Sequence, residues 1–159
     1  VMKNTEKAFI GILDILDSNK IPYKISGGFA ARVHGVNREL ADIDIEIPEK
    51  YLTFISDQVN EYITLPLQKF QDASWKLSLL VLNYEGQDID ICSTEHEIYN
   101  KQLKKWESLV GNINDCVSVK VYGKITNIDS IQNLIEYKTK LGRDVDIEDV
   151  RQLKDILKK

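Results

Sequence analysis

The sequence predicts an α+β fold in which a mixed β-sheet is flanked by helices and followed by a helical C-terminal tail. Near both ends of the chain, apolar residues recur at three- and four-residue steps, as in amphipathic helices. Between these ends, several short segments alternate apolar and polar residues, as strands do. The 159 residues show no repeat or linker, so we expect one domain over 1–159, with a core over about 1–125 and terminal helices over about 127–159.

The composition excludes several classes of protein. With 43% hydrophobic and 29% charged residues, the chain has the profile of a globular domain. Its two cysteines, Cys92 and Cys116, are too few for a disulfide framework, and its Cys and His residues do not form the two closely spaced pairs of a structural zinc site. No segment is apolar for long enough to span a bilayer, and the first seven residues lack the apolar core of a signal peptide. A cytoplasmic protein without a membrane partner is therefore expected.

The charge balance narrows the expected ligands. The net charge is −4, whereas dedicated nucleic-acid-binding proteins normally carry a basic face. This argues against a nucleic-acid-binding module. It leaves room for a free nucleotide, because one concave site can be basic on an acidic protein.

The first half of the chain begins with a helix and then turns mainly to strands. Asn19, Lys20 and Pro22 end the first helix, and Gly35 ends the second. The expected elements are a helix over about 5–18, a strand at 23–26, a short helix at 29–34, a strand at 42–47, a helix from Pro48 to about Asn60, and strands near 63–70, 75–84 and 87–92. The last two strands form a hairpin through the turn Glu85-Gly86.

The second half is expected to end in two helices. Residues 93–108 give a mixed pattern that we interpret as helical, and residues 117–122 alternate as a strand. Asp129 or Ser130 is placed to cap a helix that runs to Leu141 and stops at Gly142. Asp146 is placed to cap the last helix, with Asp149 near the positive end of the helix dipole.

One strand carries a pair of carboxylates behind a glycine turn. Side chains alternate along a strand, so Asp42 and Asp44 share one face while the intervening isoleucines face the core. Two carboxylates on one face repel each other, and a hard divalent cation such as Mg²⁺ relieves that repulsion. Upstream, Gly27-Gly28 lies between a strand and a helix start, where backbone amides can approach an anion closely.

A second Asp-Ile-Asp motif offers further ligands. By the same alternation, Asp88 and Asp90 share a face of their strand. If this strand lies beside the first, one of these acids joins Asp42 and Asp44. Three carboxylates can hold two metal ions, the arrangement that stabilises attacking and leaving oxygens in phosphoryl and nucleotidyl transfer.

The order of these motifs resembles the signature of the nucleotidyltransferase superfamily typified by DNA polymerase beta. The matching residues are Gly27-Gly28, then Ala31, His34-Gly35 and Arg38, then Asp42-Ile43-Asp44. The nearer likeness is to small bacterial branches, namely antibiotic nucleotidyltransferases, minimal nucleotidyltransferases and AbiEii-type toxins. The C-terminal segment Leu134-Ile135-Glu136-Tyr137-Lys138, with Leu141-Gly142-Arg143-Asp144 and Asp149, resembles the helical tail of those branches.

This resemblance implies transfer of a nucleoside monophosphate from a nucleoside triphosphate, by default ATP, to a hydroxyl. Asp42 and Asp44 would then bind two Mg²⁺ ions. Asp90 is preferred to Asp88 as the third ligand, because Asp90-Ile91-Cys92 matches the end of the family's strand. The phosphate-binding turn would be Ser26, Gly27 and Gly28, with Arg38 and Lys138 as triphosphate contacts. Many members have Ser after the two glycines, where this chain has Phe29.

Several other residues have simpler interpretations. We expect a structural role for His34, a core or surface position for Trp75 and Trp106, and a buried, unreactive thiol at Cys92. Arg143 is expected to pair with acids between the last two helices.

The acceptor and the assembly state stay open. A small molecule, a protein hydroxyl or an RNA end each fits, and a second subunit that completes the site is compatible with the sequence. The alternative function is a non-catalytic nucleotide-binding or antitoxin-like partner module with the same fold. A metal phosphohydrolase is a third interpretation, which the glycine turn disfavours.

Overall fold

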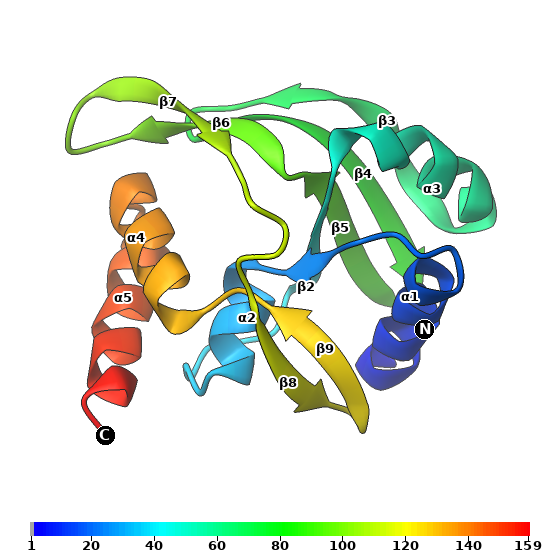
Figure 1. Ribbon diagram of the computed structural model, residues 1–159, viewed down its shortest axis with the longest axis horizontal. Coiled ribbons are helices and arrows are strands. Elements are labelled where there is room, and N and C mark those ends of the chain that lie inside the picture. Colours follow the sequence, from blue (N-terminus) through cyan, green and yellow to red (C-terminus); the bar gives the residue numbers. More distant parts are fainter. Residues whose placement is uncertain (1) are drawn as a thin grey trace.

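Across residues 2–159, which the computed structural model describes, nine strands form one curved, mixed sheet (Figure 1). The strand order is β7-β6-β4-β5-β2-β1-β9-β8, and β3 also pairs with β4. The pairs β2–β5 and β1–β9 are parallel, and the other pairs are antiparallel. The strands are β1 Lys24–Ile25, β2 Asp42–Ile47, β3 Ile63–Gln71, β4 Trp75–Tyr84, β5 Gln87–Ser93, β6 Glu95–Asn100, β7 Lys105–Val110, β8 Val117–Val121 and β9 Lys124–Ile128.

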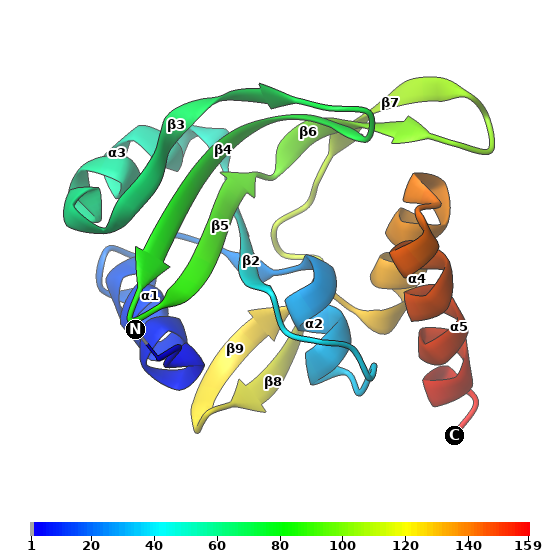
Figure 2. The same cartoon turned by 180° about the vertical axis from the view of Figure 1, so that it is seen from behind.

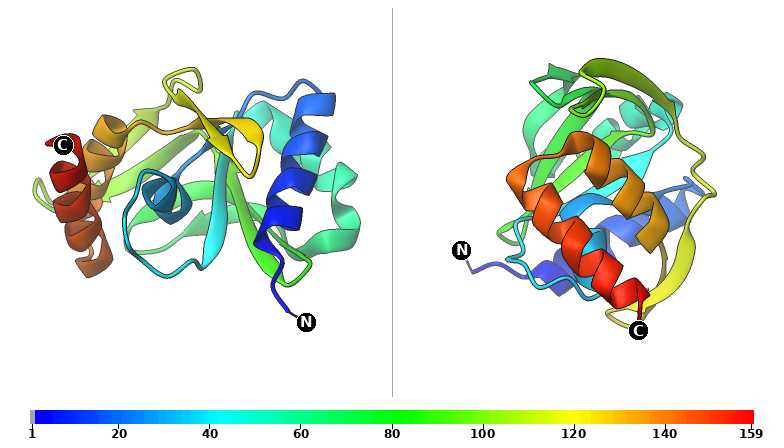
Figure 3. Two further views of the ribbon diagram at one scale, coloured as in Figure 1. Left: turned by 90° about the horizontal axis from the view of Figure 1, so that it is seen from below. Right: turned by 90° about the vertical axis from the view of Figure 1, so that its left-hand side faces the viewer.

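Helices lie at both sides of this sheet (Figures 1 and 2). They are α1 Thr5–Ser18, α2 Gly27–Val33, α3 Leu52–Gln58, α4 Ile131–Leu141 and α5 Asp144–Leu157, with 3₁₀ turns at Glu49–Tyr51 and Asn60–Tyr62. Helices α4 and α5 form an antiparallel hairpin on the opposite side of the molecule from α1 and α3 (Figure 3). None of the helices in the described part of the chain combines the length and apolar character that crossing a bilayer requires. The α+β class, mixed sheet and helical tail expected from the sequence are confirmed.

The hydrophobic core fixes which face of β2 carries the acids. Ile43, Ile45 and Ile47 are fully buried on one face of this strand. They pack with the alternate residues of β5 and β4, which are Ile89, Ile91, Leu80 and Leu82. The apolar stripe of α1 covers the same core, and its Phe9 ring stacks on Phe29 of α2. Because side chains alternate, this packing places the acids of β2 on the opposite face.

The segment 93–108 is a β-hairpin, so the helix expected there is wrong. It contains β6 and β7, which pair antiparallel from Glu95–Val110 to Asn100–Lys105. In β6, every second residue is buried, but two of these, His96 and Asn100, are polar. Their polar atoms are satisfied by hydrogen bonds, including His96 to Tyr137 and Asn100 to Glu107. Polar residues at buried positions therefore hide the two-residue period from a hydropathy pattern.

Two smaller differences concern the end of the chain. The strand expected over 117–122 ends at Val121, and a tight turn at Tyr122-Gly123, with φ of 50° and 79°, leads into β9, which the sequence pattern missed. Positive φ at both turn residues is the geometry of a two-residue hairpin. The N-cap of α5 is Arg143, and Asp146 is its third helical residue, whose carboxylate accepts a hydrogen bond from the Arg143 amide. Of the two caps considered for α4, Ser130 makes the bond, to the amide of Asn133.

Candidate active site

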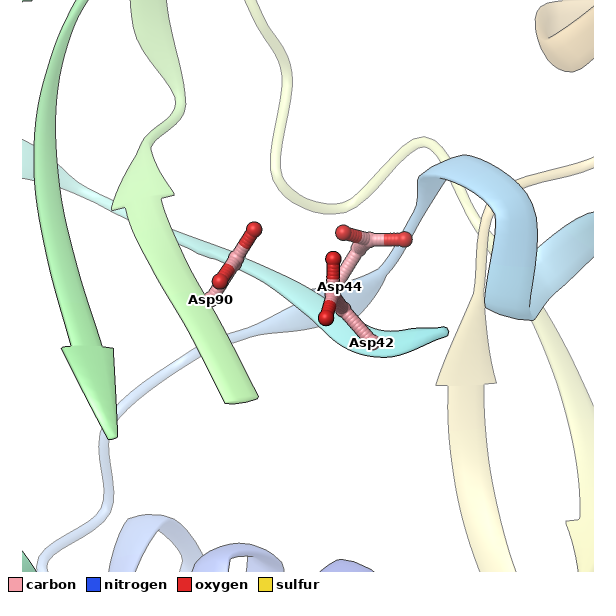
Figure 4. A group of neighbouring side chains, drawn as sticks. All are labelled: Asp42, Asp44 and Asp90. Atoms are coloured by element: carbon pink, nitrogen blue, oxygen red, sulfur yellow. The ribbon is translucent and has the colours of Figure 1, made fainter. Parts of the chain in front are cut away.

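Three carboxylates from two parallel strands converge on one face of the sheet. In the register of β2 and β5, Asp44 lies opposite Asp90, and Asp42 lies opposite Asp88. One oxygen each from Asp42, Asp44 and Asp90 lies within 4.8 Å of the others (Figure 4). Asp88 instead is exposed and accepts a hydrogen bond from the Asn83 amide. The acid that joins the pair on β2 is therefore Asp90, which the sequence comparison preferred.

The acid triad, defined as Asp42, Asp44 and Asp90, is electrostatically strained. Burial raises the pKa of Asp44 to about 6, and the neighbouring charge of Asp42 adds to the shift. Burial raises the pKa of Asp90 to about 7, with further contributions from Asp42 and Asp44. The pKa of Asp42 is also raised, first by burial and then by Asp88. A divalent cation would relieve this strain, and a compact set of carboxylate oxygens is the donor set that Mg²⁺ prefers.

The glycine turn touches this triad. Gly27 has a φ of +59°, and a Cβ atom there would lie 2.6 Å from a carboxylate oxygen of Asp44. At Gly28, a Cβ would lie 2.8 Å from the guanidinium carbon of Arg38. The amides of Gly28 and Phe29 donate to the Asp44 carboxylate, which moderates the rise in its pKa. Both positions therefore exclude larger side chains, because backbone, acid and cation meet here.

The two residues that flank the glycines have other partners. The hydroxyl of Ser26 donates to Glu46, the third acid on this face of β2, whose pKa is raised to about 7 by burial. The side chain of Phe29 is only 4% exposed and stacks on Phe9 at 5.3 Å between ring centroids. The phenylalanine that stands where the resemblance would place a serine is thus part of the hydrophobic core. Only the backbone amide of Phe29 faces the acids.

Of the four cations that line the same cavity, Arg38, Lys138 and Arg143 are held by two buried acids of α5. Arg38 and Lys138 both contact a carboxylate oxygen of Asp149, with Lys138 Nζ at 3.0 Å. Arg143 makes two bonds to Asp146, at 2.6 and 2.9 Å, and Lys138 lies 3.7 Å from the same carboxylate. The two acids are 0% and 1% exposed. The three cations and two acids together carry a net charge of +1. The part of the cavity that they line is therefore positively charged, unlike the part lined by the acid triad.

The sequence pattern missed the role of these two acids. Asp146 was expected to cap α5, and Asp149 to interact with the helix dipole. Their spacing of three residues puts them on one face of a helix. That spacing does not identify their partners, which are Lys138 on α4 and Arg38 in the loop before β2. The expected pairing of Arg143 with an acid between the last helices is confirmed, and this side chain also lines the cavity.

The cavity has a volume of about 370 Å³ and contains all eight site residues expected from the sequence. These are Ser26, Gly27, Gly28, Arg38, Asp42, Asp44, Asp90 and Lys138. Its opposite wall comes from β3 and β4 and is largely apolar. Trp75 lines this wall, whereas Trp106 contacts Tyr99 and Lys76 instead.

His34 and Cys92 have the structural surroundings that the sequence analysis expected. His34 bonds through Nε2 to the backbone oxygen of Asp129 at 2.7 Å, which is the structural role expected of it. Cys92 borders the cavity, and burial raises the pKa of its thiol far above the ordinary value, which disfavours the reactive thiolate.

Replacing Asp90 is expected to stabilise the metal-free protein at pH 8. Its folded-state pKa of about 7 lies above the ordinary 3.8, so the ionised carboxylate destabilises the fold above pH 7. Asp90→Asn removes this cost and should raise the free energy of unfolding by roughly 1–2 kcal/mol in urea titrations with EDTA. The gain should shrink as the pH falls from 7 towards 4, because the wild-type carboxyl then becomes protonated in the folded state.

The control for this prediction is Asp57→Asn, an exposed acid on α3 whose charge contributes to none of the pKa shifts in the triad, and it should leave the unfolding free energy nearly unchanged. A loss of stability in Asp90→Asn at pH 8 would contradict the electrostatic account of the triad.

Solved structures share this architecture. A candidate nucleotidyltransferase from Thermotoga maritima aligns over 94% of this chain and 91% of its own, with a TM-score of 0.74 and 20% identity. The antibiotic-resistance factor ANT(2″)-Ia aligns over 98% of this chain and 86% of its own, with a TM-score of 0.59 and 19% identity. The same factor in complex with adenylyl-2″-tobramycin gives a TM-score of 0.59 at 18% identity, covering 97% of this chain and 90% of its own.

At the level of sequence, no family model and no curated protein matches the chain. The likeness thus lies in the three-dimensional arrangement, which extends over nearly the whole chain in each case. The mixed sheet and the C-terminal helices agree with the fold that the sequence resemblance implied. The chain has the nucleotidyltransferase fold.

Proposed function

We propose that this chain is a metal-dependent nucleotidyltransferase that moves a nucleoside monophosphate from a nucleoside triphosphate to an acceptor hydroxyl. The observation that carries the proposal is the convergence of the acid triad, the glycine turn and three cations on one cavity. ATP is the nucleotide we expect. A site with acids alone would suit many hydrolases, whereas a triphosphate needs both a metal-binding face and a cationic face.

The metal-binding acids and the cations of the cavity would have different roles. Asp42 and Asp44 would hold two Mg²⁺ ions, and Asp90 would share the ion next to the acceptor. When bound there, the ions would stabilise negative charge on the attacking and leaving oxygens. Arg38 and Lys138 would contact the terminal phosphates. Because Gly27 and Gly28 have no side chains, the phosphates could approach the backbone of this turn closely.

In the proposed reaction, one bond to the α-phosphorus forms and another breaks. The acceptor oxygen attacks the α-phosphorus, and the bond from that phosphorus to the bridging oxygen of the pyrophosphate breaks. The products are the acceptor nucleotidyl ester, pyrophosphate and one proton. Asp90 lies on the acceptor side of the triad and would help to remove that proton, while the cations of α4 and of the loop before β2 stabilise the departing pyrophosphate. Most of the rate enhancement would come from positioning and charge stabilisation.

One observation favours the alternative, a non-catalytic module that binds nucleotide or a protein partner. The amides of Gly28 and Phe29 already have a partner in Asp44, and the Ser26 hydroxyl has one in Glu46. A triphosphate would use these donors only after Asp44 turns towards a metal ion. Nucleotide binding without pyrophosphate release in the presence of any acceptor would favour this module.

The proposal predicts nucleotide binding that requires both metal and triad. Calorimetric titration with a non-hydrolysable ATP analogue should show binding with Mg²⁺ and none with EDTA. In Asp42→Asn/Asp44→Asn, the affinity should fall by about 100-fold or more, because the metal loses its two shared ligands. Asp57→Asn, at an exposed acid on α3 that does not line the cavity, is the control and should bind like wild type. Equal affinity with and without Mg²⁺, or in the double variant, would contradict the proposed site.

The buried acids of α5 provide a second prediction. Asp149→Asn should release Arg38 and Lys138 from their common partner and reduce the preference for a triphosphate over a monophosphate analogue by about tenfold. The ratio of two affinities is informative because partial unfolding would lower both alike. Glu148→Gln, the exposed neighbour on the same helix, is the control. An unchanged ratio would mean that Asp149 serves only the packing of the C-terminal helices.

A further inference from the structure

The order of the strands indicates from which side of the cavity the acceptor would approach. The glycine turn follows β1, Asp42 and Asp44 lie on β2, and Asp90 lies on β5. The next strand beyond β5 is β4, which pairs with β3 on its other side. If the triphosphate lies against the turn and the cations, the hydroxyl that attacks its α-phosphorus approaches from beyond Asp90, over β4 and β3.

An apolar wall occupies this acceptor side. We call it the β3–β4 wall and define it as Phe70 of β3 with Trp75, Leu77 and Leu79 of β4, all half-buried and all lining the cavity. Residues 80 and 82 of β4 face the hydrophobic core, so alternation turns the odd-numbered leucines to the cavity. Among the described residues, the core cluster contains none of these four side chains. Their apolar surface is therefore free to cover a ligand.

Hydrogen bonds hold this wall in place. The indole Nε1 of Trp75 donates to the hydroxyl of Tyr137 at 2.9 Å, and that hydroxyl contacts His96 Nε2 at 2.8 Å. His96 Nδ1 faces the backbone oxygens of Ser93 and Thr94, at 3.0 and 3.1 Å. Since only an N–H can bond to carbonyl oxygens, Nδ1 carries the proton and Nε2 accepts from Tyr137. Because these bonds already restrain Trp75, this side chain loses little conformational entropy when a ligand binds against it.

The charges beside the wall select against a polyanion. Glu46, Asp72 and Asp90 line the same cavity as the wall. Arg143 contacts the wall, with its guanidinium carbon 4.5 Å from the centroid of the Trp75 ring, and it already makes two bonds to Asp146. An RNA end brings phosphates that need cationic partners. A polypeptide segment brings amide groups that the apolar wall would leave without hydrogen bonds.

We propose that the β3–β4 wall is the acceptor subsite and that the acceptor is a small organic alcohol with an apolar face, neutral or carrying an amine. This inference rests on the proposed function and specifies its second substrate. The alcohol oxygen bonds to the α-phosphorus, pyrophosphate leaves with the broken bond's electron pair, and the hydroxyl proton is released. Apolar contact with Phe70 and Leu77 holds the alcohol while its hydroxyl points to Asp90.

Acceptor competition tests this directly. The protein receives Mg²⁺, ATP labelled at the α-phosphate and three probe sets, namely small alcohols graded by octanol–water partition and amine content, short RNAs with a free 3′ hydroxyl, and peptides with Ser or Tyr. We expect label on the small alcohols alone, with kcat/KM rising with apolar area. Preferred labelling of RNA or peptide, preference for the most polar alcohols, or no labelling by a protein that binds the ATP analogue would each overturn the inference.

Two wall variants locate the subsite. Leu77→Asn and Phe70→Asn should raise KM for the best alcohol by about tenfold and change the affinity for the ATP analogue by less than about twofold. Ile125→Asn makes a similar change at a residue 66% exposed on β9, away from the cavity, and should change neither value. If the wall variants weaken the ATP analogue but not tripolyphosphate, the nucleobase occupies the wall and the inference is wrong.

Experiment can distinguish a failure of the proposed function from a failure of the acceptor inference. A wild-type protein that binds no ATP analogue with Mg²⁺ overturns the proposed function and the acceptor inference with it. A wild-type protein that binds the analogue and nucleotidylates RNA or peptide overturns the acceptor inference alone.

Discussion

The repulsion among three carboxylates on one face of the sheet is the constraint to which the rest of the site responds. The parallel register of β2 and β5 brings Asp44 opposite Asp90, and Asp42 adds a third charge to the same face. Water screens them poorly, so the pKa of Asp44 is raised to about 6 and that of Asp90 to about 7. The isoleucines on the other face of β2 secure this geometry, because turning the strand over would bury the acids in the core. The fold therefore holds an arrangement that nearby cations stabilise.

The surrounding elements supply that stabilisation in two ways. The amides after Gly27 turn towards Asp44, and the C-terminal hairpin contributes Lys138 and Arg143 to the same cavity and holds Arg38 there through Asp149. These cations need buried counter-charges of their own, which Asp146 and Asp149 provide. Helices α4 and α5 are thus part of the site, since they hold its cationic wall. The same hairpin carries Tyr137, which fixes Trp75 on the acceptor side, so one pair of helices organises both ends of the cavity.

Much of the fold and most of the candidate site could be predicted because they depend on local rules. The acids of β2 follow from alternation, Gly27 from its required conformation, and Ser130 from helix capping. Prediction failed where tertiary contacts override local pattern. At His96, a buried polar residue is satisfied by Tyr137, which is distant in sequence, so the segment 93–108 was mistaken for a helix. Asp149 likewise gains its meaning from Arg38, 111 residues away, and no spacing rule reveals such a partner.

The claim at the centre of this account is that the triad is a metal site that a nucleotide completes. Crystals grown with Mn²⁺ and a non-hydrolysable ATP analogue would test it most directly, because Mn²⁺ takes oxygen ligands as Mg²⁺ does and scatters anomalously. The account predicts anomalous peaks between Asp42, Asp44 and Asp90, with the triphosphate running from them towards Gly27 and Lys138. An analogue bound elsewhere, or bound in this cavity with no metal at the triad, would contradict it.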